Sequence, residues 1–167
     1  MSLWLRCLCR RPLGEHFGVE ALRNAIERFD FALMAEGQGL DDEAGHAAEN
    51  ALRLEGGGDD PLLVYYRPAD DYFIRVDLWR TTEAREELAE LADELGDGQE
   101  FERVRAHLDE TLESVAFDLK QSDLEGMGWP IAFYTAMWLA EQGDGLVEWE
   151  GAWFDPKASY SDPIADE

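Results

Sequence analysis

The most constraining feature of this sequence is an apolar segment near its C-terminal end. Residues 131–140 read IAFYTAMWLA, so a helix built from them is apolar on nearly every side. A helix without a polar face must be covered all round, and we therefore predict that this segment is the buried central helix. Gly126 and Gly128 precede it, Pro130 suits a first helical turn, and the Gly-Asp-Gly at 143–145 ends it.

Strands are predicted where apolar and polar side chains alternate. Residues 3–10 alternate in this way and form the first expected strand. Residues 62–66 and 72–79 are rich in β-formers and flank a Pro-Ala-Asp-Asp turn, which is typical of a hairpin. Residues 146–149 are expected as the last strand, and residues 31–36 as an additional one.

Helical spacing of apolar residues predicts the remaining elements. Residues 19–29 and 82–95 each have a helical apolar stripe. The stripe from Phe101 to Leu119 steps by three or four residues throughout and predicts one long helix. Residues 41–54 remain undecided, because their acidic start favours a helix while their alanines give it little to bury.

This order of elements predicts an α+β fold. We expect a two-layer sandwich, with an antiparallel or mixed sheet and helices on one face. The strand, helix, hairpin, helices, strand order matches a ferredoxin-like βαββαβ layout with extra helices in the second helical layer. A strand at residues 31–36 would make it a different two-layer sandwich. We expect one domain over residues 1–155, followed by a polar C-terminal tail at 156–167.

Charge is the property that bears most directly on function. The chain carries 38 acidic and 14 basic residues, for a formal net charge of −24. Such a surplus repels nucleic acids and anionic membranes, so we expect neither as a partner. A basic protein is the expected partner. A GC-rich genome or adaptation to high salt would also produce this composition. The sequence shows neither a secretory signal nor an apolar run of about 20 residues, which predicts a cytoplasmic protein.

The main candidate site is an acidic stripe on the helix predicted after Thr82. The side chains that we assign to it as partner-binding residues are Glu83, Glu86, Glu87, Glu90 and Glu94. Like charges four residues apart in a helix cost a few tenths of a kcal/mol per pair. A basic partner would relieve that repulsion. A solvated helix face in an acidic protein is the alternative interpretation of the same stripe.

Tryptophans near the C-terminal end supply the second candidate surface. Trp129 and Trp153 lie beside glycine and turn residues, and we assign them to the partner-binding surface. Trp138 and Trp149 are expected in the core. Exposed tryptophans and a free strand edge at 146–149 would support a homodimer.

No motif for a metal, a cofactor or catalysis emerges from the sequence. Cys7 and Cys9 are the only cysteines and His16 follows them, which is too few ligands for a structural zinc site. Both sulfurs are expected on the inward face of the first strand, packed in the core. The glycines at 56–58 lack a following lysine and are interpreted as a turn, so they indicate no phosphate loop.

Three functions follow from these observations. The first is a non-enzymatic acidic protein that binds a basic partner, such as an immunity-type inhibitor of a bacterial toxin. The second is a small-molecule-binding domain or enzyme with a Trp-lined pocket. The third is an acidic domain whose charge reflects salt adaptation. The sequence does not identify the partner, any ligand or the oligomeric state.

Overall fold

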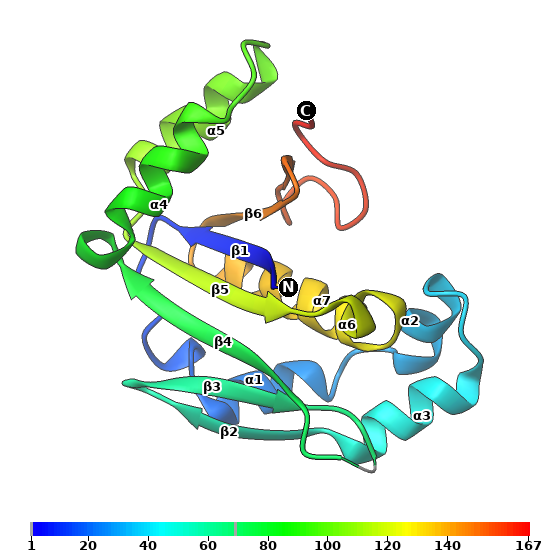
Figure 1. Cartoon of the computed structure of the whole chain (residues 1–167). Helices are drawn as coiled ribbons and strands as arrows, with labels where there is room; N and C mark the ends of the chain where they lie inside the picture. Colours follow the sequence, from blue (N-terminus) through cyan, green and yellow to red (C-terminus); the bar gives the residue numbers. More distant parts are fainter. Residues whose placement is uncertain (1, 69) are drawn as a thin grey trace. The chain divides into compact units, whose positions relative to one another are not determined.

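The computed structural model describes residues 2–68 and 70–167 and confirms the α+β class (Figure 1). Helices and strands follow one another along the whole described chain. In order they are β1 (Leu3–Cys9), the 3-10 turn η1 (Gly14–His16), α1 (Val19–Ile26), α2 (Phe31–Gly37), α3 (Asp42–Ala51), β2 (Arg53–Gly57), β3 (Asp60–Tyr65), β4 (Phe73–Arg80), α4 (Thr81–Asp93), α5 (Glu100–Asp109), β5 (Glu113–Leu119), α6 (Gln121–Glu125), α7 (Gly128–Gln142), β6 (Gly145–Trp149) and β7 (Ala152–Phe154).

Seven strands form one antiparallel sheet in the order β2-β3-β4-β5-β1-β6-β7. The predicted hairpin is confirmed: β3 pairs with β4, with Leu62 opposite Val76 and Val64 opposite Ile74. These four side chains are buried, as alternation requires. The ferredoxin-like detail is not confirmed, because the sheet has seven strands where a βαββαβ unit has four.

The strand edge expected at residues 146–149 is absent. β6 lies between β1 and β7, and all three strands are paired antiparallel. Glu150 and Gly151 reverse the chain between β6 and β7 with positive φ angles of 47° and 86°. This is the turn geometry that suits a two-residue hairpin. The expectation of a free edge is therefore wrong, because the short strand β7 was not recognised in the sequence.

The chain forms two compact units, each assembled from separated segments. Unit 1 contains residues 1–4, 15–77 and 117–135, and unit 2 contains residues 5–14, 78–116 and 136–167. Single-domain folding over residues 1–155 remains a prediction. We describe each unit by itself.

In unit 1, the strand expected at residues 31–36 is wrong, because these residues form helix α2. Asp30 caps its start by accepting a hydrogen bond from the backbone N–H of Leu33 (3.0 Å). Phe31, Met34 and Ala35 are buried on one side, at the spacing of a helix. The undecided segment 41–54 contains α3 and the start of β2.

The long helix expected from Phe101 to Leu119 is also wrong. Helix α5 ends at Asp109, and the stripe continues into strand β5. The backbone of Leu112 marks the change, because its N–H donates to the Cys9 carbonyl (2.8 Å) and its carbonyl accepts from Thr81 (2.9 Å). β5 is buried on both faces over most of its length, so it lacks the alternation by which strands are recognised.

Unit 2 has a core shared by α4, α5, the strands β1, β6 and β7, and the C-terminal segment. Trp153 lies in this core and is 2% exposed, so its assignment to the surface is wrong. The Trp153 N–H donates to the Ala165 carbonyl (2.8 Å), and the Ile164 N–H donates to the Trp153 carbonyl (2.7 Å). The polar tail therefore returns to β7 and covers this indole. Trp138 and Trp149, expected in the core, are only partly buried.

Two further expectations concern the cysteines and membrane-spanning helices. Cys7 and Cys9 are fully buried, as predicted, with their sulfurs 3.6 Å apart. Among residues 2–68 and 70–167, no helix has both the length and the apolar character needed to cross a membrane.

Candidate functional site

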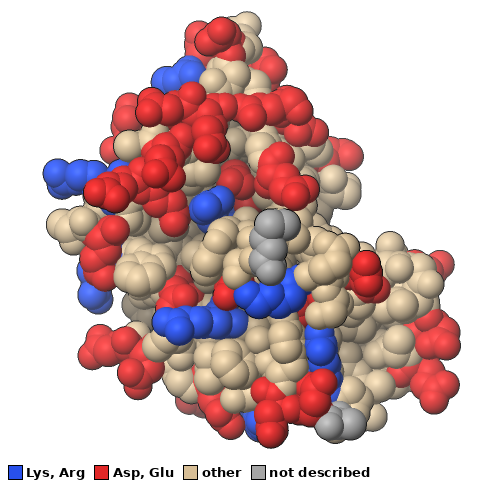
Figure 2. Space-filling view, in the orientation of Figure 1, with Lys and Arg blue, Asp and Glu red and all other residues tan. Residues whose placement is uncertain are grey.

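The acidic stripe predicted from the sequence follows helix α4 in unit 2. Glu83, Glu86 and Glu90 are exposed on α4, and Glu94, also exposed, is the C-cap residue of the helix. Figure 2 shows carboxylates crowded over α4 and α5, in the upper part of the view. Exposed Arg85 on α4 and Arg103 and Arg105 on α5 are outnumbered by the carboxylates, so the surface is anionic.

Glu87 differs from the other stripe residues because it has a cationic partner. It is partly buried, and its Oε1 lies 3.3 Å from Arg6 Nε and accepts a hydrogen bond from Ser114 Oγ (3.2 Å). The negative charge of Glu87 is therefore paired with a cation of the same unit. The outward-facing stripe therefore consists of the four other glutamates.

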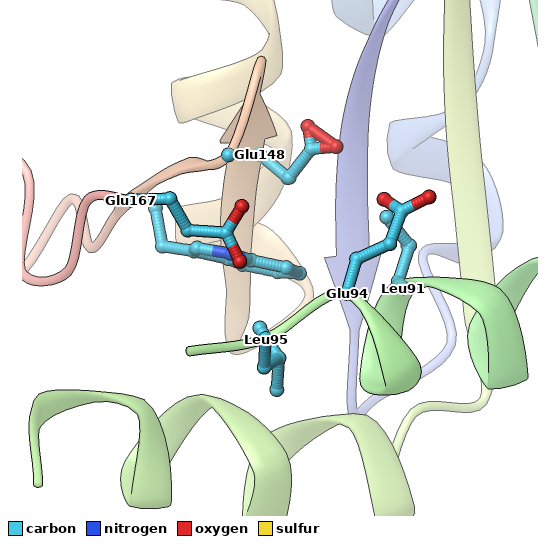
Figure 3. Close-up of a pocket in the computed structure, with 7 residues that line it drawn as sticks. Leu91, Glu94, Leu95, Glu148 and Glu167 are labelled. Atoms are coloured by element: carbon cyan, nitrogen blue, oxygen red, sulfur yellow. The ribbon is translucent and has the colours of Figure 1, made fainter. Parts of the chain in front are cut away.

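Glu94 lines a small pocket that opens to solvent (Figure 3). Its walls come from the end of α4, from β6, from the β6–β7 turn and from the C-terminal segment. The lining residues are Leu91, Glu94, Leu95, Glu148, Gly151, Trp153 and Glu167. We call this set the acidic pocket. It combines three carboxylates with an apolar wall of two leucines and an indole.

Glu148 is the buried carboxylate of the acidic pocket. Its position on β6 is opposite Arg6 of β1 on one side and opposite Trp153 of β7 on the other. Glu148 is 5% exposed, whereas Glu94 and Glu167 are exposed. Glu148 thus lies at the base of the pocket, and the other two carboxylates lie at its rim.

The two oxygens of Glu148 have different surroundings. Oε1 accepts a hydrogen bond from Arg6 Nη1 (3.1 Å), while the buried Oε2 has no hydrogen-bond partner among the described residues. Buried polar atoms are normally hydrogen-bonded, so this unpaired carboxylate oxygen is unusual and remains available as an acceptor. Burial raises the pKa of Glu148, and nearby Glu94 and Glu87 raise it further, against the lowering effect of Arg6.

The third carboxylate, Glu167, is positioned by the pairing of the C-terminal segment with β7. That pairing is the Trp153–Ala165 bridge described above. Gly151 lies close by: a Cβ atom built on it would be 3.2 Å from Glu167 Oε2. Gly151 also has a left-handed φ, so both its conformation and its small size fit this wall of the pocket.

The chemistry of the acidic pocket favours cation binding. Glu148 has three other carboxylates around it, those of Glu87, Glu94 and Glu167, and among the described residues Arg6 is the cation that pairs with Glu148 and Glu87. The lining residues include no serine, cysteine or histidine that could act as a nucleophile or base. Across residues 2–68 and 70–167, no group of three His, Cys, Asp or Glu side chains is arranged to hold a metal ion.

A second polar cluster lies in unit 1, around the fully buried Asp123. Its oxygens accept hydrogen bonds from the hydroxyls of Tyr66 (2.6 Å) and Tyr72 and from the backbone N–H of Lys120 (2.8 Å). Burial, followed by the bond to Asp123, raises the pKa of both tyrosines. Both carboxylate oxygens are satisfied, and Gly128 packs against them. This cluster therefore stabilises the start of α6 and α7 and offers no open ligand position.

The predicted site residues do not form one surface. Glu94 and Trp153 meet in the acidic pocket, while Glu83, Glu86 and Glu90 extend along α4 outside it. Trp129 belongs to unit 1, where it is partly buried with its ring centroid 5.4 Å from that of Phe133.

Sequence reasoning missed Glu148 and Glu167. The signal for Glu148 was its place in an otherwise apolar strand, since a glutamate in such a run is unusual. No comparable signal marked Glu167, because its position depends on how the C-terminal segment folds back.

Comparison of the chain with protein-family models, with curated proteins and with solved structures found no match in any of the three.

Proposed function

We propose that this protein is a non-enzymatic interaction protein that binds a basic partner protein through α4 and the acidic pocket. The observation that carries this proposal is the buried, unpaired oxygen of Glu148 at the base of a carboxylate-lined pocket. An anionic surface beside it would attract a cationic partner and orient its approach. We further propose a cytoplasmic location for this interaction.

An immunity-type inhibitor of a bacterial toxin is the specific form of this proposal that we favour. A toxin that cleaves nucleic acid needs a cationic surface to hold its substrate. The anionic surface of α4 would compete with the nucleic acid for this cationic surface of the toxin. The acidic pocket supplies carboxylates and apolar side chains, which suits the binding of a cationic group.

The proposal is tested by comparing the wild-type chain with a variant of the outward stripe. In Glu83→Gln/Glu86→Gln/Glu90→Gln, three exposed charges are removed while the acidic pocket is left intact. Both proteins are used to capture partners from native lysate at about 50 mM salt, where the Debye length is between about 10 and 30 Å. The captured proteins are identified by mass spectrometry, purified and used for association-rate measurements.

We expect a basic protein that is retained by the wild type and lost or reduced with the triple variant. Its association rate should fall at least tenfold between about 50 and 500 mM salt, because steering by charge is screened. Glu27→Gln, another glutamate substitution but outside α4 and in unit 1, is the matched control and should retain the partner. Retention that is equal for all three proteins, or an association rate that ignores salt, would contradict the proposal.

A further inference from the structure

We propose that the acidic pocket binds the ammonium group of a single lysine side chain from the partner. This inference rests on the proposed function and specifies the chemical group that the acidic pocket recognises. It is argued from the unpaired oxygen of Glu148, from the arrangement of the three carboxylates and from the apolar wall.

The first step is that the acidic pocket needs a cation from outside the unit. Arg6 contacts Glu148 (3.1 Å) and Glu87 (3.3 Å), and among the described residues no ion pair joins it to Glu94 or Glu167. Glu94 and Glu167 add negative charge beside a buried carboxylate that is 5% exposed. These rim carboxylates disfavour the ionised form of buried Glu148, and a ligand with positive charge would reverse that effect.

The distances that each kind of cation needs to its ligands distinguish an organic cation from a metal ion. Metal ions need oxygen ligands at about 2.0–2.6 Å, and the carboxylates of the described residues are not grouped closely enough to supply three. A hydrogen-bonding nitrogen sits about 2.7–3.2 Å from each acceptor and so spans a wider set of carboxylates. An ammonium or a guanidinium therefore suits the acidic pocket better than a metal ion does.

Hydrogen-bond geometry at Glu148 favours ammonium over guanidinium. Arginine binds a carboxylate best through two parallel hydrogen bonds to both oxygens. Arg6 already donates to Oε1 of Glu148, so a second, bidentate arginine would have to share that oxygen, whereas Oε2 is open to a single donor. An ammonium carries three donors that point in different directions, and it can take one oxygen from each of Glu94, Glu148 and Glu167.

The apolar wall identifies the source of the ammonium as a side chain. Leu95, the partly exposed member of this wall, lies beside Glu94 and would contact the methylene groups of a lysine. Figure 3 shows Glu94, Glu148 and Glu167 arranged around the same opening, with Leu91 and Leu95 on the side of α4. The lysine side chain is a narrow, unbranched stem that ends in a compact ammonium, so it suits the buried Oε2 of Glu148 at the base of the acidic pocket. A small free amine lacks such a stem and gains less from this wall.

The experiment titrates the full chain with three blocked tripeptides, acetyl-Ala-X-Ala-amide, in which X is lysine, arginine or norleucine. Binding is followed by NMR at the indole N–H of Trp153 and by calorimetry. We expect the lysine peptide to bind at least threefold more tightly than the arginine peptide, and no binding of the norleucine peptide. Butylammonium chloride is the free-amine probe and should bind at least threefold more weakly than the lysine peptide.

Variants then test the assigned carboxylates. Glu148→Gln should weaken the lysine peptide about tenfold, and Glu167→Gln should weaken it severalfold. Glu167 is exposed, so its variant tests the site even where the substitution at buried Glu148 affects folding. Glu27→Gln, an exposed glutamate of unit 1 outside both α4 and the acidic pocket, is the matched control and should change the affinity less than twofold.

Equal binding of lysine and arginine peptides, or of butylammonium, would overturn this inference, as would unchanged affinity in both pocket variants. These outcomes are separable from failure of the proposed function. A captured basic partner that binds normally to Glu148→Gln and Glu167→Gln overturns the lysine inference alone. Specific lysine-peptide binding without any basic partner would overturn the proposed function and leave the pocket assignment standing.

Discussion

Glu148 and His107 are two buried titratable residues of unit 2 whose environments shift their pKa values in opposite senses. Glu148 loses hydration and has further carboxylates nearby, which disfavours its charged form. His107 is buried as well, and its ring nitrogen Nε2 lies 2.7 Å from the Leu8 carbonyl oxygen. Burial lowers its pKa, against the raising effect of that backbone contact. Each of the two pKa shifts therefore predicts a different dependence of the free energy of unfolding on pH.

For Glu148, the folded state binds its proton at higher pH than the unfolded state does. Ionisation of Glu148 thus costs stability at neutral pH, and this cost is relieved as pH falls through its raised pKa toward the ordinary value of 4.5. Glu148→Gln lacks this titration. We expect its stability, measured relative to wild type by urea unfolding, to be most favourable at about pH 7.5 and to decline toward pH 4.5. A difference that is constant over this range would contradict the assignment.

For His107, the unfolded state takes up the proton first as pH falls below the ordinary value of 6.5. Neutral His107 therefore contributes stability that is fully present above pH 6.5 and is lost as pH falls through its lowered pKa. His107→Gln retains a donor for the Leu8 carbonyl but does not titrate. We expect wild type to lose more stability than this variant between about pH 7 and pH 5, as measured by urea unfolding with the NMR titration of the imidazole alongside.

At the scale of elements, helices α2 and α3 of unit 1 pack closely at one glycine. A Cβ atom on Gly45 of α3 would lie 2.5 Å from the Phe31 carbonyl oxygen at the start of α2. That contact cannot be relieved without moving backbone. The close approach of these helices therefore depends on the absence of a side chain at this position.

Gly45→Ala should destabilise the protein by about 1–3 kcal/mol, because it forces the two helices apart. Gly37→Ala is the matched control, since a Cβ there meets nothing within 4 Å. Alanine at that helical position should be neutral or stabilise by up to about 1 kcal/mol. Thermal and urea unfolding measure both. Similar effects of the two substitutions would show that the helices are not packed as described.

The C-terminal segment offers a second prediction at this scale. Ala165 is 4% exposed and pairs with Trp153, so Ala165→Asp would bury a carboxylate beside the indole. We expect a loss of about 2–4 kcal/mol in the free energy of unfolding. Ala158→Asp, an exposed position in the same segment, is the control and should change it by less than about 0.5 kcal/mol. Equal losses would contradict the packing of this segment.

The elements that sequence reasoning identified correctly are those whose apolar pattern is set locally. The hairpin of β3 and β4 alternates because one face is buried, and α7 is apolar because it is surrounded. β5 was misassigned because burial on both faces removes alternation and leaves apolar residues at spacings that also fit a helix. For residues 31–36 the decisive signal was the Asp30 cap, which favours a helix over a strand.

At the scale of the whole molecule, the net charge of −24 sets the dependence on salt. Carboxylates that repel one another through solvent are screened within a Debye length of about 10 Å at 0.1 M and about 3 Å at 1 M. We expect the melting temperature to rise between about 0.02 and 0.3 M NaCl and then level off. A rise that continues to molar salt would instead support salt adaptation as the origin of the charge. Scanning calorimetry distinguishes the two.

The candidate site shows the same division between local and non-local information. The α4 glutamates were found from the sequence because helix spacing groups them. The acidic pocket was not, because it joins α4 to Glu148 and Glu167 across more than fifty residues of sequence. Only the pairing of β1, β6 and β7 with the returning C-terminal segment brings these carboxylates together.

The C-terminal segment forms one wall of the acidic pocket, and this has a practical consequence for purification. A hexahistidine tag fused directly after Glu167 would begin beside the pocket rim. Its imidazoles gain protons below about pH 6.5 and would then compete as tethered cations at high local concentration. Fusions used for interaction assays should therefore be placed at the other terminus or cleaved before use.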